Sequence, residues 1–464
     1  MTYLLSLTIL LAPTFAWNFK IGPFPTNFLM VWIAVVWLVF TINLFAKKQL
    51  AAFFAFVKNL DTKVLIGVIG FSLAGLISLF IQGIDRQKLG QFIVLFVQPI
   101  SLFFISAYTL HQNPDRKFII NNSLFVILGL SGAYAIYQYF TLHGLPQVYW
   151  GNSQEPKRAV SFFGHPDFYS LFTAPLLAFL LTDLGLKIQD FRKHFVYFGA
   201  WILGAAGLLL SLSRAGWVGL AGAIIVYAIF SGNKIIRRLI LAGAIAIILI
   251  VTVTPNLRYR VLLPFYGEKS AVSRFSLWHT GLKAAKQSPV LGLGLNGFGN
   301  NWKSLNTDPN LDTHNFPHNI FLDIWVDLGL IGLISFVWLC GLYIVRGFLS
   351  LRVSSRGGPI LGGHPKQSSS SGVIPRNASD EESLNVSTTD KGSLHSFGST
   401  QSVGMTQETT GLPHQSAALL SRNDNLKFAI TLFLITLLVQ GLFDNPYFRN
   451  DLALVFWIVL SMIL

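Results

Sequence analysis

The sequence predicts an all-α polytopic membrane protein, and three features of its composition and pattern lead to that class. Apolar residues make up 52% of the 464 residues and charged residues only 12%, whereas about 25% of an average soluble domain is charged. The apolar residues lie in continuous runs near the roughly 20 residues that one bilayer crossing needs. These runs lack the alternation of a membrane β-barrel, so helices are the expected spans.

About twelve apolar runs are present, and residues 1–464 are expected to form a single integral membrane domain. No basic region precedes the first run, as it would in a cleaved signal peptide, so this run is expected to be a retained span. The predicted spans are residues 2–17, 27–46, 64–82, 89–109, 118–140, 168–186, 195–213, 215–231, 238–253, 318–345, 427–443 and 452–464.

Positive charge is distributed unevenly over the connections between these runs. The even-numbered connections hold most of the Lys and Arg residues, while the short odd-numbered ones hold few. Because basic connections stay in the cytoplasm, the N- and C-termini are both predicted to be cytoplasmic. Two long segments, 141–167 and 254–317, are then external.

The cytoplasmic segment 353–425 differs from the rest of the chain in composition. It is rich in Ser, Thr, Gly and Asn and has almost no aromatic residues. Such a segment cannot bury enough apolar surface to fold alone. We predict a disordered loop here and favour a solvated linker over a regulatory segment.

The distribution of the net charge of +14 argues against a nucleic-acid-binding protein, and the single cysteine argues against a disulfide-rich or thiol-metal protein. The 34 Lys and Arg residues are scattered between apolar runs and form no basic stripe. They therefore indicate orientation among membrane lipids, and nucleic acid is not an expected partner. Cys340 lies inside an apolar run, so no disulfide framework and no thiol metal site is expected.

Arginine stands in each of three segments predicted at or near the external face. Arg158 comes shortly before a Gly-His-Pro-Asp turn, and Arg214 lies in the tight hairpin "SLSRAGWVGL" between two spans. Arg274 opens a stretch in which Arg274, Trp278, Leu282 and Ala285 repeat at helical spacing, as in an amphipathic helix on a membrane surface. Taken alone, Arg214 is equally explained as a membrane anchor and Arg158 as a surface residue.

Glycines 292, 294 and 297 behind that stretch match GxGxxG by spacing. No strand precedes them and no βαβ unit follows, so a dinucleotide site is rejected. A backbone that must turn sharply or approach a ligand closely explains these glycines better.

The tenth run opens with "HNIFLDIWVDLGLIGL", which is unusually polar for a lipid-facing helix. His318 stands at its start, and Asn319, Asp323 and Asp327 form an i, i+4 ladder below it. Carboxylates are costly in hydrocarbon, so this face is expected to line a cavity. His314 and His318 are also four apart, but Pro317 between them disfavours a shared helical face, so no metal site is expected.

Taken in order, "SRAGWVGL", "SRFSLWHTGLKAAKQSPVLGLGLNGFG" and "HNIFLDIWVDLGLIGL" resemble the O-antigen ligase and O-antigen polymerase superfamily of membrane glycan transferases. The resemblance covers residues 199–345, including the external loop 254–317. The family usually has Glu where this chain has Asp323 and Asp327. It often has Gly-Asn-Pro-Asn where this chain has Gly-His-Pro-Asp at 164–167.

The resemblance implies a GT-C-like glycosyltransferase in the bacterial cytoplasmic (inner) membrane, with a large periplasmic loop. Such an enzyme transfers a glycan from an undecaprenyl diphosphate carrier to a hydroxyl acceptor, on lipid A core or on another lipid- or protein-linked molecule. Arginine suits a diphosphate because its fork of donors is always charged, so no metal or other cofactor is expected.

The residues quoted above take roles under this resemblance. His318 would be the catalytic base, or would orient the acceptor hydroxyl, in a single displacement with inversion. The diphosphate-binding residues would be Arg158, Arg214 and Arg274. The supporting residues would be Asn319, Asp323 and Asp327.

Alternatives within the same chemistry are a polymerase of O-antigen or exopolysaccharide repeats and a protein O-oligosaccharyltransferase. From another class, a proton-coupled transporter would also explain carboxylates inside spans. The halves of the chain show no evident repeat, however, and the arginines stand at external mouths, away from the midplane where transport sites lie.

Overall fold

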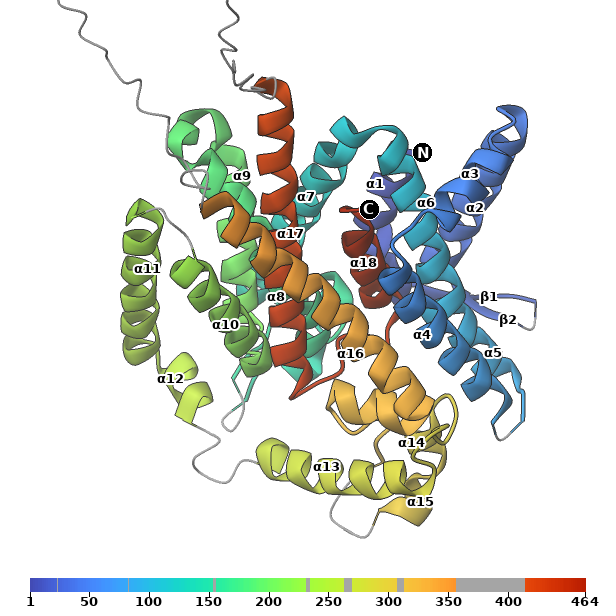
Figure 1. Ribbon diagram of the computed structural model, residues 1–464. Helices are drawn as coiled ribbons and strands as arrows, with labels where there is room; N and C mark the ends of the chain where they lie inside the picture. The colour runs from blue at the N-terminus through green and yellow to red at the C-terminus, as the bar shows by residue number, and fades with distance from the viewer. Residues whose placement is uncertain are drawn as a thin grey trace, which may run out of the picture. The chain divides into compact units, whose positions relative to one another are not determined.

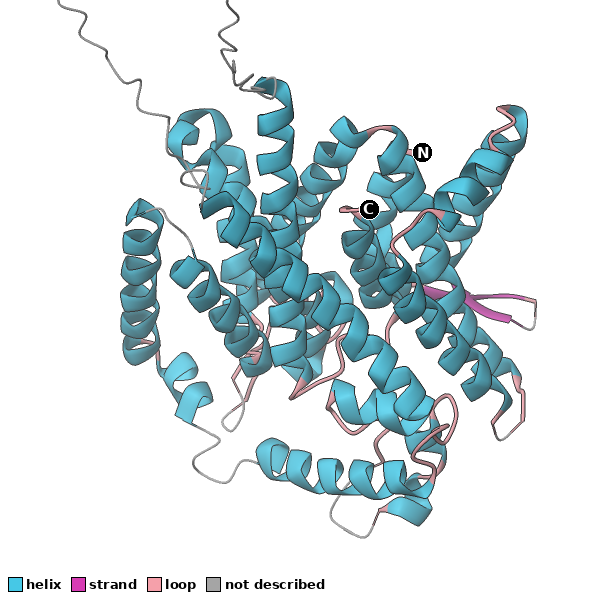
Figure 2. Ribbon diagram, viewed as in Figure 1, coloured by secondary structure: helices cyan, strands magenta, loops and turns pink. Residues whose placement is uncertain are grey.

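The computed structural model describes residues 1–22, 24–81, 83–152, 156–230, 234–262, 269–306, 313–355 and 414–464. Helices dominate these residues, and one short two-stranded hairpin accompanies them (Figure 2). The chain divides into two compact units, residues 364–420 and the remainder, and the fold below is that of the remainder.

The helices follow one another along the chain as labelled in Figure 1. They are α1 (Thr2–Leu11), α2 (Phe28–Ala46), α3 (Leu50–Lys58), α4 (Thr62–Phe80), α5 (Arg86–Phe92), α6 (Gln98–Gln112), α7 (Lys117–Thr141), α8 (Pro166–Lys187), α9 (Phe191–Leu210), α10 (Arg214–Phe230), α11 (Lys234–Val253), α12 (Pro255–Leu262), α13 (Lys269–Gln287), α14 (Gly297–Asn300), α15 (Trp302–Leu305), α16 (Ile320–Ser355), α17 (His414–Gly441) and α18 (Asn450–Ser461). The strands β1 (Asn18–Ile21) and β2 (Phe24–Asn27) pair antiparallel between α1 and α2.

Within the described part of the chain, eight helical stretches are long and apolar enough to cross a membrane. They are Phe28–Ala46, Thr62–Phe80, Arg86–Gln112, Pro114–Thr141, Pro166–Lys187, Phe191–Leu210, Ile320–Leu351 and Asn423–Gly441. Four shorter apolar helices, Thr2–Ala16, Arg214–Phe230, Ile240–Val253 and Asn450–Ser461, coincide with the remaining predicted runs. The predicted class, an all-α multi-pass membrane protein, is confirmed, while the count of twelve spans and the cytoplasmic termini stay predictions.

Small residues bring the spans into close contact. A Cβ at Gly132 of α7 would stand 2.3 Å from the backbone of Leu203 in α9, so only glycine permits this approach. Gly67 of α4 likewise leaves room for Leu339 of α16. Close backbone packing of this kind is the main source of helix association in lipid, where apolar burial gives little driving force.

Helix α16 differs from the predicted tenth span, residues 318–345, at both ends. It begins at Ile320, because His318 has a left-handed φ of +52° that a helix cannot contain. It also bends at Gly329, where φ is +69°. The helix continues to Ser355, so the first residues of the predicted loop 353–425 are helical, as are its last, which belong to α17. Residues 356–413 lie outside the described residues.

An ion pair marks the end of α16 that lies far from His318. Asp61 caps the start of α4 by accepting from the backbone N–H of Lys63, and its carboxylate also pairs with Arg346. Ser78, near the other end of α4, donates to the backbone carbonyl of Asp327 at 2.8 Å. The two helices therefore run side by side over most of their length, which fixes the His318 end of α16 against the rest of the bundle.

Candidate functional site

His318 lies in the bend that precedes α16 and points at a carboxylate from the opposite end of the chain. Its Nδ1 stands 3.2 Å from Oδ1 of Asp444. The histidine side chain is 25% exposed and the aspartate side chain 6%, so one end of the pair is open and the other is enclosed. A left-handed backbone in a residue other than glycine is uncommon and often marks a functional position.

Asp444 belongs to the loop between α17 and α18, residues 442–449, which is held rigidly from both sides. Its Oδ1 also accepts from the backbone N–H of Asn445 at 2.9 Å. The Asn445 side chain accepts from the N–H groups of Tyr447 and Phe448 and donates to Asp323. Asp323 is 3% exposed, so its role is to hold the loop that carries the partner of His318.

Asn319 and helix α13 fix the same loop from the side of His318. The Asn319 side chain accepts from the first N–H groups of α16 and donates to the carbonyl of Leu442 at 3.1 Å. Arg274 Nε donates to the carbonyl of Phe443 at 3.1 Å. Trp278, one turn further along α13, donates to the carbonyl of His318 at 3.3 Å. The predicted helix is present as α13, and its Trp side chain contacts the site, while its place on a membrane surface stays a prediction.

Asp327 serves a different neighbour from Asp323 although both lie on one helical face. Its two oxygens accept from the backbone N–H groups of Asn296 and Gly297, each at 3.0 Å. It is 5% exposed. The expectation that this face lines a cavity is wrong for the two carboxylates, because protein groups satisfy and enclose both of them.

Gly292 explains why the glycine-rich segment can approach α16 so closely. Its φ is +78°, and a Cβ there would stand 2.6 Å from the backbone nitrogen of Gly329 at the bend of α16. The bend and the loop thus meet backbone to backbone. The expectation of a sharp turn is confirmed, and the close approach seen here is to α16, while an approach to a ligand stays a prediction.

Arg158 lies in a second polar cluster, around the start of α8. Its Nη2 stands 2.7 Å from Oδ1 of Asp167, and its Nε donates to the carbonyl of Ser211 at 2.9 Å. Arg214 begins α10 directly after Ser213, whose backbone N–H donates to the hydroxyl of Ser211 at 3.3 Å. Arg158 therefore joins Asp167 to the segment that leads into α10, in a cluster separate from the contact that Arg274 makes.

His165 connects this second cluster to the loop that carries Asp444. Its Nδ1 accepts from the backbone N–H of Asp167 at 3.1 Å and so caps α8. Burial lowers the pKa of His165, while the charges of Asp167 and Asp444 act in the opposite direction. The ring of Phe168 contacts His165 at 4.9 Å between centroids.

Arg449 completes the connection from the other side of Phe168. Its guanidinium lies 3.9 Å from the ring centroids of both Phe168 and Phe15, and two of its nitrogens bond to Asp451 at 3.1 and 3.0 Å. The arginine side chain is 10% exposed. The loop 442–449 and the start of α8 are therefore in contact, and residues of both clusters lie along this contact.

Sequence reasoning missed Asp444, Asn445 and Arg449, although a signal for them was present. The predicted topology left "DNPYFRND" as a short external connection between the last two spans, and five of its eight residues are charged or carry an amide. Among the described residues, no group of three or more His, Cys, Asp or Glu side chains gathers as a metal site would require.

The fold and this site define a multi-pass helical membrane protein whose polar residues meet where several helices begin or end. Residues 199–337 match the model of a family described as O-antigen ligase. The match confirms the predicted resemblance, and it includes His318, Arg214 and Arg274, while Arg158 and Asp444 lie outside it.

One curated protein of Haemophilus influenzae, described as uncharacterized, is similar to part of the chain. It is 30% identical over 169 residues, which make up 32% of this chain and 42% of that protein. The chain therefore spans less than half of the length of the relative it matches.

Proposed function

We propose that this protein transfers a glycan from an undecaprenyl diphosphate carrier to a hydroxyl acceptor at the outer face of the cytoplasmic membrane, as an O-antigen ligase does. The observation that carries the proposal is the pair of His318 and Asp444. It lies at the start of a span, close to an arginine-bearing helix, and its histidine falls inside the region that matches the family.

The geometry of the pair suits a general base. An ionised carboxylate only accepts hydrogen bonds, so Asp444 fixes the proton of His318 on Nδ1. The other ring nitrogen, Nε2, then carries the lone pair and can take a proton. This is the arrangement in which a buried aspartate orients a catalytic histidine without itself taking the proton.

The proposed step is a single displacement. The acceptor oxygen attacks the anomeric carbon of the glycan as His318 Nε2 takes the hydroxyl proton. A new C–O bond forms, the bond from the anomeric carbon to the diphosphate oxygen breaks, and undecaprenyl diphosphate leaves with the electron pair. Attack from the opposite side inverts the configuration at that carbon.

Arginine charge would offset the charge of the departing diphosphate. Arg274 stands on the helix that also contacts His318, and Arg158 bonds to Asp167 in the neighbouring cluster. Arg214 begins α10 three residues after Ser211, whose carbonyl accepts from Arg158. Guanidinium groups held in advance stabilise developing negative charge without reorganising during the step. We therefore propose that arginines take the part that a metal ion takes in other transferases.

Reconstituted protein tests the proposal directly. Vesicles containing the protein receive labelled undecaprenyl-diphosphate-linked glycan together with lipid A core, and transfer of the label to the core is followed by gel electrophoresis. The variant His318→Ala should lose transfer, while His143→Ala, which removes an exposed histidine from the first external segment, should retain it. Equal rates in the two variants would refute the role of His318.

The same chemistry serves a polymerase or a protein O-oligosaccharyltransferase, so the acceptor decides between the three. Growth of long carrier-linked chains without added core would indicate a polymerase, and label on a protein hydroxyl would indicate a protein transferase. Loss of carrier-linked glycan at the wild-type rate in an Arg214→Ala, His318→Ala double variant would reject all three. Uptake driven by a proton gradient would then favour a transporter.

A further inference from the structure

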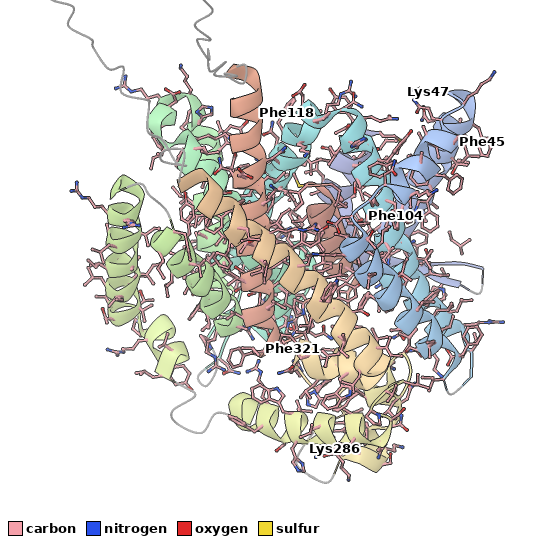
Figure 3. The ribbon with its side chains drawn as sticks, in the orientation of Figure 1. Phe45, Lys47, Phe104, Phe118, Lys286 and Phe321 are labelled. Carbon is pink, nitrogen blue, oxygen red and sulfur yellow. The ribbon has the colours of Figure 1, made fainter. Side chains whose placement is uncertain are left out.

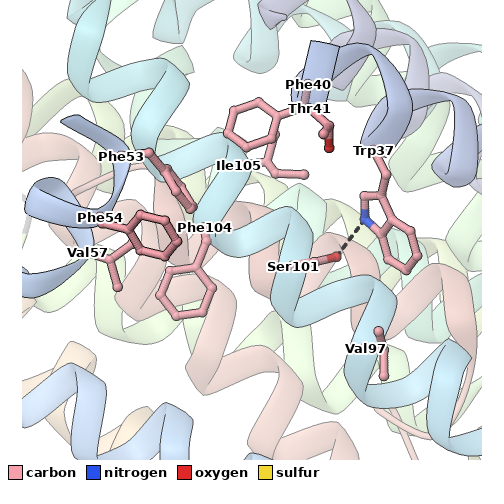
Figure 4. A pocket seen from close by; sticks show the side chains of 10 residues that line it. All are labelled: Trp37, Phe40, Thr41, Phe53, Phe54, Val57, Val97, Ser101, Phe104 and Ile105. Carbon is pink, nitrogen blue, oxygen red and sulfur yellow. Dashed lines mark hydrogen bonds between the residues drawn. The ribbon is translucent and has the colours of Figure 1, made fainter. Parts of the chain in front are cut away.

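An aromatic groove lies on the helices α2, α3 and α6, away from the candidate site (Figure 4). Its volume is about 530 Å³, within the range of about 300–1,000 Å³ that small-molecule sites occupy. Figure 4 shows the rings of Phe53, Phe54 and Phe104 gathered on one side, with Phe40 and Trp37 along the other. We refer to it below as the aromatic groove.

The polar atoms of the aromatic groove are largely used within the protein. Trp37 Nε1 donates to the hydroxyl of Ser101 at 2.7 Å, and that hydroxyl donates to the carbonyl of Gln98. Phe54 is 62% exposed. The groove therefore offers a ligand mainly apolar contact, which suits a hydrocarbon chain.

A smaller polar cavity adjoins the groove, and Phe40 lines both. Its volume is about 120 Å³, room for about four water molecules at roughly 30 Å³ each, and so for a phosphate group. Lys47 and Arg116 stand at this cavity with the amides of Asn43 and Gln112. None of the described residues that line it is Asp or Glu. We call it the cationic cavity.

The two cavities lie at the far end of the bundle from His318. Helix α3 precedes Asp61, which pairs with Arg346, and about 16 helical residues at about 1.5 Å each separate Arg346 from the bend at Gly329, beyond which His318 lies. Figure 3 shows Lys47 and Phe45 at the upper right and Phe321, whose backbone N–H donates to Asn319 of the candidate site, lower and nearer the middle. The basic connection that holds Lys47 is predicted to be cytoplasmic.

We propose that the aromatic groove and the cationic cavity together bind one anionic phospholipid. An acyl chain lies in the groove beside Phe40, and the phosphate lies in the cavity between Lys47 and Arg116. Arginine and lysine near an anionic headgroup each strengthen such binding. The carrier-linked donor is not the occupant, because its diphosphate is used at the other end of α16.

Native mass spectrometry of the full-length protein released from detergent micelles tests the proposal. The probes are phosphatidylglycerol and phosphatidylcholine of the same chain length. Wild-type protein should retain phosphatidylglycerol roughly 30-fold better, as expected for two basic side chains that each contribute about 1 kcal/mol at one anionic headgroup. A Lys47→Gln, Arg116→Gln double variant should lose that preference. The matched control, Arg192→Gln with Lys193→Gln, removes equal charge from another predicted cytoplasmic connection and should keep it.

Two further variants test the groove and the charge of the cavity separately, and the charge-preserving one controls for misfolding. Added inorganic phosphate distinguishes a bound lipid from a bound free anion. Thr41→Trp fills the groove and should abolish retention of phosphatidylglycerol, while Lys47→Arg with Arg116→Lys preserves charge and should keep the preference. Equal retention of both lipids by the wild type would overturn the proposal. So would displacement of the lipid by inorganic phosphate alone, or unchanged retention in the Thr41→Trp variant.

Discussion

The molecule contains two neighbouring histidine and aspartate pairs, and their surroundings differ. In the first, Asp167 is bonded by Arg158, and the Nδ1 atom of His165 accepts from the backbone N–H of Asp167. In the second, Asp444 lies 3.2 Å from Nδ1 of His318, and no Lys or Arg among the described residues forms an ion pair with it within 4.0 Å.

These surroundings favour His318 over His165 as the proposed base. The carboxylate beside His165 is engaged by a guanidinium, and the Nδ1 lone pair of that histidine already caps a helix. Asp444 has His318 as its partner, so it can direct the lone pair of the histidine outward. Burial also lowers the pKa of His165, which suits a neutral structural group. His165 and Asp167 therefore stabilise the fold, whereas His318 and Asp444 are proposed to take part in catalysis.

Exchange of the histidine in each pair should give the largest contrast. His318→Gln should lower the rate of glycan transfer by about 10²–10⁴-fold, the usual contribution of a general base. His165→Gln should change this rate far less. The measurement is initial transfer rate at saturating donor in vesicles, with donor binding followed separately. A larger loss at His165 than at His318 would reverse the assignment.

Removal of the carboxylate in the second pair should have the next largest effect. Asp444→Asn keeps the size of the side chain but loses its charge, so His318 is no longer held in one orientation, and the rate should fall by about 100-fold. Asp115→Asn, at an exposed position remote from His318, is the matched control. A wild-type rate in Asp444→Asn would show that the pair is structural.

Removal of Arg158, the cation bonded to Asp167 of the first pair, should lower the free energy of unfolding. Arg158→Gln leaves Asp167 without its charged partner, and we expect a loss of about 1.5–3 kcal/mol in the free energy of unfolding. Adding Asp167→Asn should restore much of this stability, which thermal unfolding in detergent would measure. If Arg158 also binds the diphosphate, the double variant should fold but transfer slowly, whereas full activity would limit Arg158 to a structural role.

The smallest effect should appear in the pH dependence of stability. Because the folded protein lowers the pKa of His165, the neutral histidine stabilises the fold above the ordinary value near 6.5, and this contribution is lost as the pH falls through the lowered pKa. His165→Asn keeps a side-chain oxygen that can cap α8 but does not titrate. Its unfolding temperature should therefore fall less than that of the wild type between neutral and mildly acidic pH.

The local pattern of apolar residues was sufficient to predict most of the helical spans. A bilayer crossing requires a continuous apolar helix of known length, so the spans could be read from runs of residues. The family resemblance likewise came from contiguous motifs around Arg214, Arg274 and His318, and the match to residues 199–337 confirms it. Boundaries were less certain, because the left-handed backbone of His318 depends on contacts outside its own segment.

The sequence by itself determined the membrane class, the helical spans, the glycine segment that must turn and the histidine at the start of a span. Only the tertiary structure decided which groups these residues meet. The partner of His318 lies 126 residues further along the chain, and Asp323 and Asp327 bind different loops although they occupy one helical face. Such pairings depend on how helices distant in sequence pack together, and no local periodicity records that packing.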